Sequence, residues 1–167
     1  SYAEGDVLET GVGLSDNSKF YPKEVQKIMA VDWVKKCLEY CMVNNKDQRK
    51  EFRLEDCENM AFEENSFDTV VDVFGLQFYS NPEKVLKEMK RVCKGNGKIL
   101  ILVKGLSQYS WFNKYLDLIN GKYVCLYGMY INRDWDEIIS KSGLEILRSE
   151  RKINGTLYFY ILKNKKA

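Results

Sequence analysis

One stretch near the start of the chain, Asp6–Ser15, limits the possible folds more than any other. It contains an apolar run that meets a carboxylate, Glu9, and then two glycines, Gly11 and Gly13. This pattern predicts a buried strand that breaks into a tight loop, where the backbone can approach a ligand closely because glycine has no side chain. In open α/β sheets, a loop of this kind after the first strand holds a nucleotide-like ligand.

Strand-like and helical patterns alternate along the rest of the chain. The predicted strands cover residues 6–10, 28–32, 52–54, 67–74, 98–103, 144–151 and 156–162. The last two are separated by Ile153-Asn154-Gly155, and an Asn-Gly pair between two strands predicts a hairpin. The sequence therefore predicts an α/β fold: a Rossmann-like open sheet, mostly parallel, that ends in an antiparallel β-hairpin and has helices on both faces.

Three helices are predicted between these strands. Apolar residues recur at helical spacing from Val34 to Met42. A second helix has Asn81 as its N-cap and Pro82 at its first position, a combination that favours helix initiation. The third is expected to begin at an Asn132 cap and to end at Gly143.

The ends of the predicted strands are acidic. Glu9, Asp32 and Asp56 each lie at or near one of them, and the carboxyl ends of parallel strands share one rim of the sheet. A dinucleotide fingerprint requires a third glycine at position 16, where this chain has Asp16. A pyrophosphate would meet these carboxylates with no Lys or Arg in the loop. The rim favours hydroxyls, amines and a positive centre instead, and S-adenosylmethionine carries all of these.

Composition excludes several classes of site and partner. There is no histidine in the 167 residues, which excludes histidine acid–base pairs and histidine metal ligands. Five cysteines without a Cys-x-x-Cys motif indicate neither a metal site nor a disulfide framework, so we expect an intracellular reducing compartment, either cytoplasm or mitochondrion. A net charge of +2 gives no electrostatic case for nucleic acid, and no apolar run is long enough for a membrane span.

Four motifs, in this order and spacing, resemble those of the class I S-adenosylmethionine-dependent methyltransferases. They are Glu9-Thr10-Gly11-Val12-Gly13, the strand-end Asp32, the run Leu54–Phe62, and Ser66–Val71 followed by Leu76-Gln77 and Pro82–Glu88. The resemblance covers most of the chain and is nearest to the methyltransferase type 11 group, which includes quinone-biosynthesis enzymes. It implies S-adenosyl-L-methionine as the cofactor and S-adenosyl-L-homocysteine as the product.

The resemblance implies a role for each matching residue on the methionine and ribose side. Gly11 and Gly13 would let the backbone pass close to the methionine part, in a loop that also contains Thr10. Glu9 would order this loop and face the ammonium group. Asp32 would accept hydrogen bonds from both ribose hydroxyls, which requires a carboxylate with free lone pairs.

On the adenine and methyl side, the resemblance implies a second set of contacts. Trp33 and Met60 would flank the adenine, Asp56 would accept from its amino group, and the backbone amide of Cys57 would donate to the ring. The two residues expected near the sulfonium are Val73 and Phe74, with Gln77 beside the substrate.

Most of these positions also have a purely structural interpretation. Gly11 and Gly13 fit a simple tight turn, Asp32 fits a cap for the following helix, and Asp56 fits a cap for the turn that follows it. Two of the aromatic candidates fit a core equally well: Trp33 and Phe74. Asp72 is expected to face a helix or solvent and receives no role.

The substrate side is expected in segment 105–135, which is dense in aromatic residues. The candidates are Gln77, Tyr109, Trp111, Tyr127 and Tyr130. Such density favours an apolar or lipid-like acceptor, and the alternative is that these rings close the flank of the sheet. Asp134 and three of these tyrosines are possible general bases, none of them stands out, and no catalytic residue is assigned.

The leading prediction is an enzyme that transfers a methyl group to a small or lipid-like acceptor by in-line displacement. Such a reaction depends mainly on positioning and desolvation. A non-catalytic binding subunit of the same fold and a nicotinamide-dependent oxidoreductase remain alternatives, and Asp16 argues against the latter. We expect one domain over residues 1–167. Because its first strand follows soon after Ser1, the helices that precede this strand in relatives are expected to be absent. The oligomeric state stays open.

Overall fold

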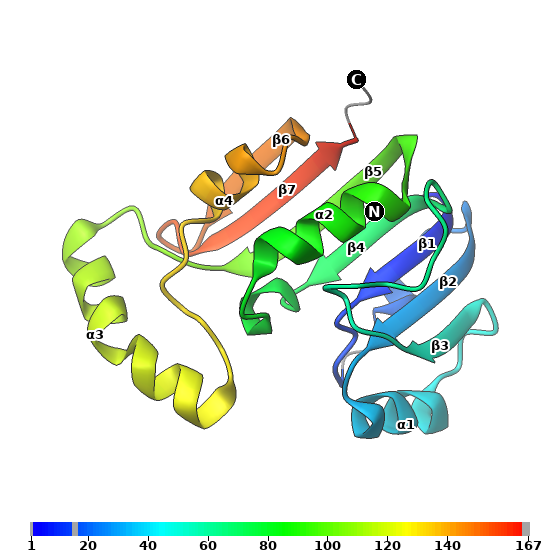
Figure 1. Ribbon diagram of the computed structural model, residues 1–167, viewed down its shortest axis with the longest axis horizontal. Helices are drawn as coiled ribbons and strands as arrows, with labels where there is room; N and C mark the ends of the chain where they lie inside the picture. The colour runs from blue at the N-terminus through cyan, green and yellow to red at the C-terminus, as the bar shows by residue number, and fades with distance from the viewer. Residues whose placement is uncertain (1, 15–16, 165–167) are drawn as a thin grey trace.

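The computed structural model describes residues 2–14 and 17–164. Its strands form one seven-stranded sheet in the order β3-β2-β1-β4-β5-β7-β6 (Figure 1). Their bounds are β1 Gly5–Thr10, β2 Val25–Asp32, β3 Lys50–Leu54, β4 Phe67–Val73, β5 Cys93–Lys104, β6 Glu145–Lys152 and β7 Leu157–Lys163. Strands β1 to β5 pair in parallel, whereas β7 pairs antiparallel with both β5 and β6. The predicted open sheet with a terminal hairpin is confirmed.

Helices cover both faces of this sheet, as predicted. They are α1 Lys35–Asn44, α2 Pro82–Val92, α3 Ser110–Tyr127 and α4 Trp135–Lys141, with short 3-10 turns at Ser18–Phe20 (η1) and Leu76–Phe78 (η2). Successive side chains of a strand point to opposite faces. Val31 of β2 accordingly packs in the cluster that contains Val85 of α2, while its neighbour Ala30 packs against Leu38 of α1. Figure 1 shows α2 and α4 together in front of the sheet.

The start of α2 follows its sequence signals, but the start of α4 does not. Asn81 accepts a hydrogen bond from the Lys84 amide at 3.1 Å and precedes Pro82, as predicted. The predicted cap of α4 at Asn132 is wrong. The N-cap is Asp134, whose carboxylate accepts from the Glu137 amide at 3.1 Å, while the Asn132 side chain donates to another residue. Asn and Asp are both good N-caps. The Asn132 side chain is bonded to Asp117 instead, so α4 begins after Asp134.

The two faces are covered unequally. The α2 and α4 side holds the larger core, in which Trp135, Tyr158 and Tyr160 are fully buried. On the other face, α1 packs over β2 and β3, and a smaller cluster around Val71 and Leu100 borders an open hollow. Within the described residues, no helix is both long enough and apolar enough to cross a bilayer. Asp16 lies outside the described residues.

Candidate functional site

The glycine loop, residues 11–14, follows β1 at the carboxyl rim of the sheet. Gly11 and Gly13 have φ of 60° and 56°, a region that L-residues rarely adopt. A Cβ on Gly11 would lie 3.0 Å from the Gly75 Cα and 3.3 Å from the Tyr79 hydroxyl. A Cβ on Gly13 would meet nothing closer than the Gly11 carbonyl oxygen, at 3.9 Å. Gly11 is therefore required by close packing, and Gly13 by its backbone conformation.

This difference predicts unequal costs for alanine at the two glycines. Gly13→Ala is expected to lower the free energy of unfolding by about 1–2 kcal/mol, the usual cost of a left-handed L-residue. Gly11→Ala is expected to cost about 1–3 kcal/mol more, because the new methyl group overlaps backbone. Urea unfolding of the two variants measures the difference, and equal losses would contradict this account of Gly11.

Asp32 ends β2 and joins the glycine loop to the start of α1. Its side chain is 5% exposed. One carboxylate oxygen accepts from the Gly13 amide and the other from the Val34 amide, both at 2.8 Å. Val34 is itself the N-cap residue of α1, and no side chain caps that helix. Each Asp32 oxygen keeps a lone pair, so the carboxylate is held in place and still able to accept from a ligand hydroxyl.

The predicted adenine side lies around the next strand end. Trp33 is 70% exposed beside Asp32, so its ring is available to a ligand. Asp56 is exposed and accepts from the Glu58 amide at 2.8 Å, as its structural interpretation predicts. Met60 lies in the core instead, and its amide donates to Glu88 at 2.8 Å.

Cys57 is buried against the glycine loop. Burial raises the pKa of the thiol to about 12, although the neighbouring Tyr79 hydroxyl and Gly11 amide favour the thiolate. Burial also raises the pKa of Tyr79, the neighbour that limits space at Gly11. The thiol therefore stays protonated, and Cys57 as a whole residue is fully buried beneath the loop.

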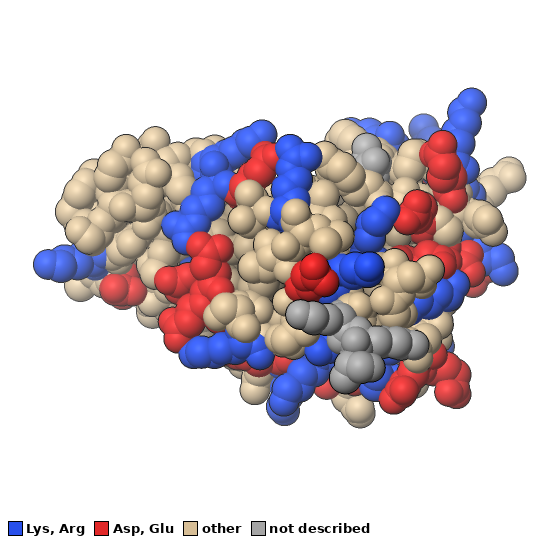
Figure 2. Space-filling view, turned by 90° about the horizontal axis from the view of Figure 1, so that it is seen from above, with Lys and Arg blue, Asp and Glu red and all other residues tan. Residues whose placement is uncertain are grey.

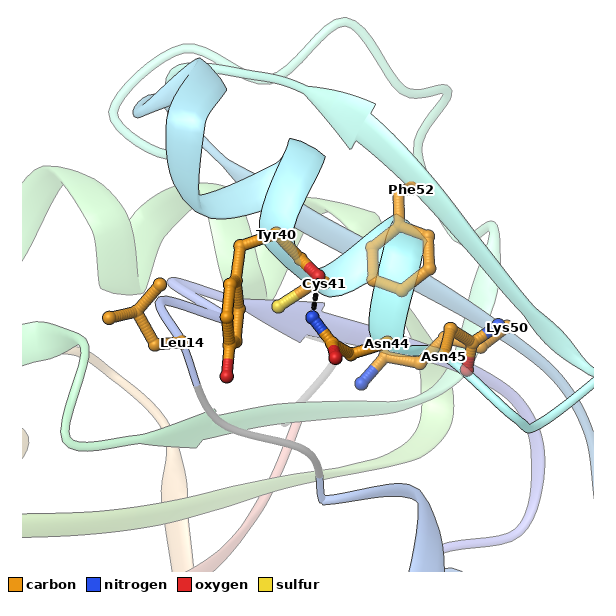
Figure 3. A pocket seen from close by; sticks show the side chains of 7 residues that line it. All are labelled: Leu14, Tyr40, Cys41, Asn44, Asn45, Lys50 and Phe52. Atoms are coloured by element: carbon orange, nitrogen blue, oxygen red, sulfur yellow. Dashed lines mark hydrogen bonds between the residues drawn. The ribbon is translucent and has the colours of Figure 1, made fainter.

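Glu9 points away from the rim, into a buried ion pair. Its carboxylate lies 2.9 Å from the Lys50 ammonium, and both side chains are almost fully enclosed. Asn17 donates a further hydrogen bond to it at 2.7 Å. Lys50 also lines a cavity of about 30 Å³ with residues of α1, Leu14 and Phe52 (Figure 3). That volume holds about one water molecule, so this cavity is not a cofactor site.

Asp72, to which no role was assigned, is fully buried at the end of β4. Thr10 donates to one of its oxygens at 3.0 Å, and the Gly75 and Leu76 amides donate to the other, both at 2.9 Å. Burial raises the pKa of this carboxyl to about 7, despite those hydrogen bonds. Asp72 thus joins β1, β4 and η2 beneath the glycine loop.

An apolar hollow of about 410 Å³ begins where β4 ends. Val73 and Phe74 are among its lining residues, and Phe74 has an unusual positive φ of 63°. Its amide donates to the Leu102 carbonyl at 2.8 Å, which fixes this turn against β5. The remaining lining residues come from β4, β5, β7 and the segments around Tyr2 and η1.

The structure brings only part of the predicted substrate side to the rim. Gln77 is buried. Its backbone carbonyl accepts from the Tyr130 amide at 2.9 Å, while its side-chain amide donates to the Met129 sulfur and accepts from the Lys104 amide. Three other candidates lie on α3 or at its cap and are exposed: Tyr109, Trp111 and Tyr127. Tyr130 follows the helix and is half-buried.

Arg133 holds this substrate-side segment against η2. Its guanidinium donates to the Leu76 and Tyr79 carbonyls and lies 4.1 Å from the centre of the Tyr130 ring. The sequence showed no signal for Arg133, Lys50 or Asp72, since each lies outside any motif. Among the described residues, no cluster of acidic or cysteine side chains is suited to a metal ion.

Comparisons with known proteins agree with this geometry. A family model described as a methyltransferase domain matches residues 8–101. The mitochondrial methyltransferase OMS1 of Saccharomyces cerevisiae is 26% identical over 186 residues, covering 98% of this chain and 39% of the relative. Demethylmenaquinone methyltransferase of Thermotoga maritima is 32% identical over 98 residues, covering 58% and 42%. The chain spans about two fifths of the length of these relatives.

Solved structures share the fold over nearly the whole chain. Phosphoethanolamine N-methyltransferase 2 of Haemonchus contortus, solved with phosphomonomethylethanolamine and S-adenosylhomocysteine, superposes with a TM-score of 0.75. The match covers 98% of this chain and 49% of that chain at 18% identity, so it supports the fold alone.

Proposed function

The chain belongs to the methyltransferase domain family, and on that premise we propose that it is an S-adenosylmethionine-dependent methyltransferase for a small or lipid-like acceptor. The observation that carries this proposal is the fixed carboxylate of Asp32. It lies at the end of β2, next to the glycine loop, with lone pairs left for a ribose diol.

The residues around Asp32 fit the other parts of this cofactor. The exposed ring of Trp33 suits one face of an adenine, and Asp56 retains a carboxylate oxygen for its amino group. Gly11 and Gly13 leave the loop backbone accessible without side chains. Glu9 is ion-paired with Lys50, so we assign it the ordering of the loop from within the protein.

When bound, the cofactor would supply a methyl group attached to a sulfonium sulfur, which is readily displaced as a neutral thioether. The protein then has to position the acceptor and exclude water, which lowers the barrier without an obligatory base. Val73 and Phe74 line the apolar hollow at the end of β4, so the acceptor is expected to be apolar near its reacting atom. The relative from Thermotoga maritima is named for a quinone substrate, which supports a lipid-like acceptor.

We further propose that residues 1–167 act as one methyltransferase domain, with 105–135 on the substrate side. The contacts of Gln77 and Arg133 with the segment after α3 support this assignment. All five cysteines are free thiols, which supports an intracellular reducing compartment. The yeast relative is named as mitochondrial, and cytoplasm or mitochondrion both fit.

Calorimetry with S-adenosylhomocysteine tests the proposal. Asp32→Asn is expected to weaken binding about 10- to 100-fold, the scale of a lost charge-assisted hydrogen bond. Asp68→Asn is the matched control: Asp68 also accepts a backbone amide, from Asp6 at 3.0 Å, but at the opposite end of the strands. It should leave the affinity unchanged.

Two outcomes would overturn parts of this assignment. If the protein does not bind S-adenosylhomocysteine at millimolar concentration, the proposed function is wrong. Unchanged affinity in a folded Asp32→Asn variant, judged by near-ultraviolet circular dichroism, removes the role of Asp32. Binding without methyl transfer to any of a broad panel of apolar acceptors would favour the non-catalytic binding subunit.

A further inference from the structure

Helix α3 carries an apolar face that the rest of the described chain leaves uncovered. Of its 18 residues, Leu116 is the one that is buried. Leu118 and Leu126 are 80% and 71% exposed, and Trp111 and Tyr115 share their side of the helix. Figure 1 shows α3 standing away from the sheet, and in Figure 2 this end of the molecule, at the left, is largely tan. Exposed large apolar side chains gathered on one side of a helix favour a binding surface.

The chemistry of this face matches the surface of an anionic lipid bilayer. Trp and Tyr combine an apolar ring with a polar edge and concentrate at the boundary between lipid and water. Lys114 and Lys122 lie on the same side of α3, and Lys122 stands between Leu118 and Leu126 at i, i+4 spacing. Their long side chains can reach lipid headgroups while the stems stay in the apolar layer. The single acidic residue of the helix, Asp117, accepts a hydrogen bond from Asn132 at 2.8 Å. The helix therefore carries a net charge of +1, and its exposed side presents aromatic and leucine side chains together with lysine.

Both ends of α3 are fixed to the substrate-side rim. At its start, the Ser107 hydroxyl donates to the Asn154 carbonyl in the β6–β7 turn at 2.7 Å, and the Asn113 side chain joins the first turn of α3 to Ser107 through bonds of 2.7 and 2.9 Å. After its end, Gly128 forms a left-handed cap, and Met129 contacts Gln77. A surface that binds α3 thus comes to lie beside the end of β4 and β5.

We propose that α3 binds flat to an anionic lipid bilayer, with Trp111, Leu118 and Leu126 toward the acyl chains. The substrate-side rim then faces the membrane, and a lipid-like acceptor reaches it from the bilayer. This last step rests on the proposed function, whereas binding of α3 to lipid does not.

Vesicle cosedimentation tests the surface directly. The protein is expected to bind vesicles of phosphatidylcholine mixed with phosphatidylglycerol, and to bind pure phosphatidylcholine more weakly. Leu118→Glu/Leu126→Glu should reduce partitioning about ten-fold or more, because it places two charges in the apolar face. Glutamate is a good helix former, so circular dichroism should show α3 intact. The matched control is Met42→Glu/Val43→Glu, two exposed apolar residues of α1, and it should retain at least half of the wild-type binding.

Trp111 provides an independent readout. Trp135 is buried and Trp33 is removed by Trp33→Phe, so the fluorescence change on adding vesicles comes from Trp111. A blue shift is expected with anionic vesicles and its absence with the double glutamate variant.

Three results would overturn the proposal. The first is no binding to anionic vesicles, and the second is an equal loss of vesicle binding in the α3 and α1 variants. The third is a blue shift that occurs without lipid and accompanies dimer formation in sedimentation velocity. The last would assign α3 to a second copy of the chain. Calorimetry with S-adenosylhomocysteine on the α3 and α1 variants, made with Trp33 intact, separates this proposal from the proposed function. Cofactor affinity should not change when vesicle binding is lost.

Discussion

Lys50→Met is expected to lower the free energy of unfolding by about 3–5 kcal/mol, because it leaves the Glu9 carboxylate buried without its cation. The two groups lie 2.9 Å apart, with 2% and 1% of their side chains exposed. Little water reaches the carboxylate to compensate for the lost partner. Urea unfolding at neutral pH measures the loss directly.

Two further variants separate burial from charge. Lys50→Met/Glu9→Gln is expected to recover more than half of the loss, since the neutral amide needs no cation and can still accept from Asn17. Lys98→Met removes the cation of the exposed pair with Glu4 and should cost less than about 1 kcal/mol. A loss at Lys50 no larger than at Lys98 would show that Glu9 finds another partner.

Stability is expected to fall as the pH rises from 5.5 to 7.5, because Asp72 must ionise within the fold. Burial raises its pKa from 3.8 to about 7, so the folded state holds a proton that the unfolded chain has already released. The resulting stabilisation is fully present below pH 3.8 and is lost as the pH passes through about 7. Over the stated window the loss amounts to about 2 kcal/mol, or about 4–8 °C in Tm.

Asp72→Asn removes the titrating group while keeping the hydrogen bonds. The asparagine oxygen can accept from Gly75 and Leu76. Its amide group can donate to the Thr10 hydroxyl, which then donates to the Val71 carbonyl. Thermal unfolding of this variant should show a nearly flat Tm across the window.

The control for this titration is Asp68→Asn, which should keep the slope of the wild type. Burial opposes ionisation of Asp68, but the Lys94 side chain and the Asp6 amide together lower its pKa, so it is ionised in both states above pH 5.5. A slope that survives in Asp72→Asn would assign the titration to another group.

The sequence predicted those parts of the site that depend on local pattern. The tight loop at Gly11 and Gly13 and the position of Asp32 at a strand end were predictable, because apolar runs that end in glycines or in a carboxylate indicate such strand ends directly. Lys50 was not predictable, since a lysine at a strand start usually faces solvent. Its partner Glu9 lies 41 positions away along the chain.

The same distinction applies to the fold. The Asn81-Pro82 start of α2 and the Ile153–Gly155 hairpin follow from local chemistry, and both are confirmed. The start of α4 depended on which of two capping residues was free, and the Asn132 contact with Asp117 decided it. Long-range competition of this kind cannot be inferred from a single stretch of sequence.

The order of the strands leaves two edges of the sheet open, at β3 and β6. Open edges invite pairing with a strand of another copy, the first step toward ordered aggregates. Strand β6 carries Arg148, Glu150 and Lys152 in succession along one side, with their charges engaged in ion pairs. An incoming strand would have to disrupt these pairs, and β3 is only five residues long. These features of β3 and β6 therefore disfavour association of copies through the sheet edges, whereas α3 remains exposed.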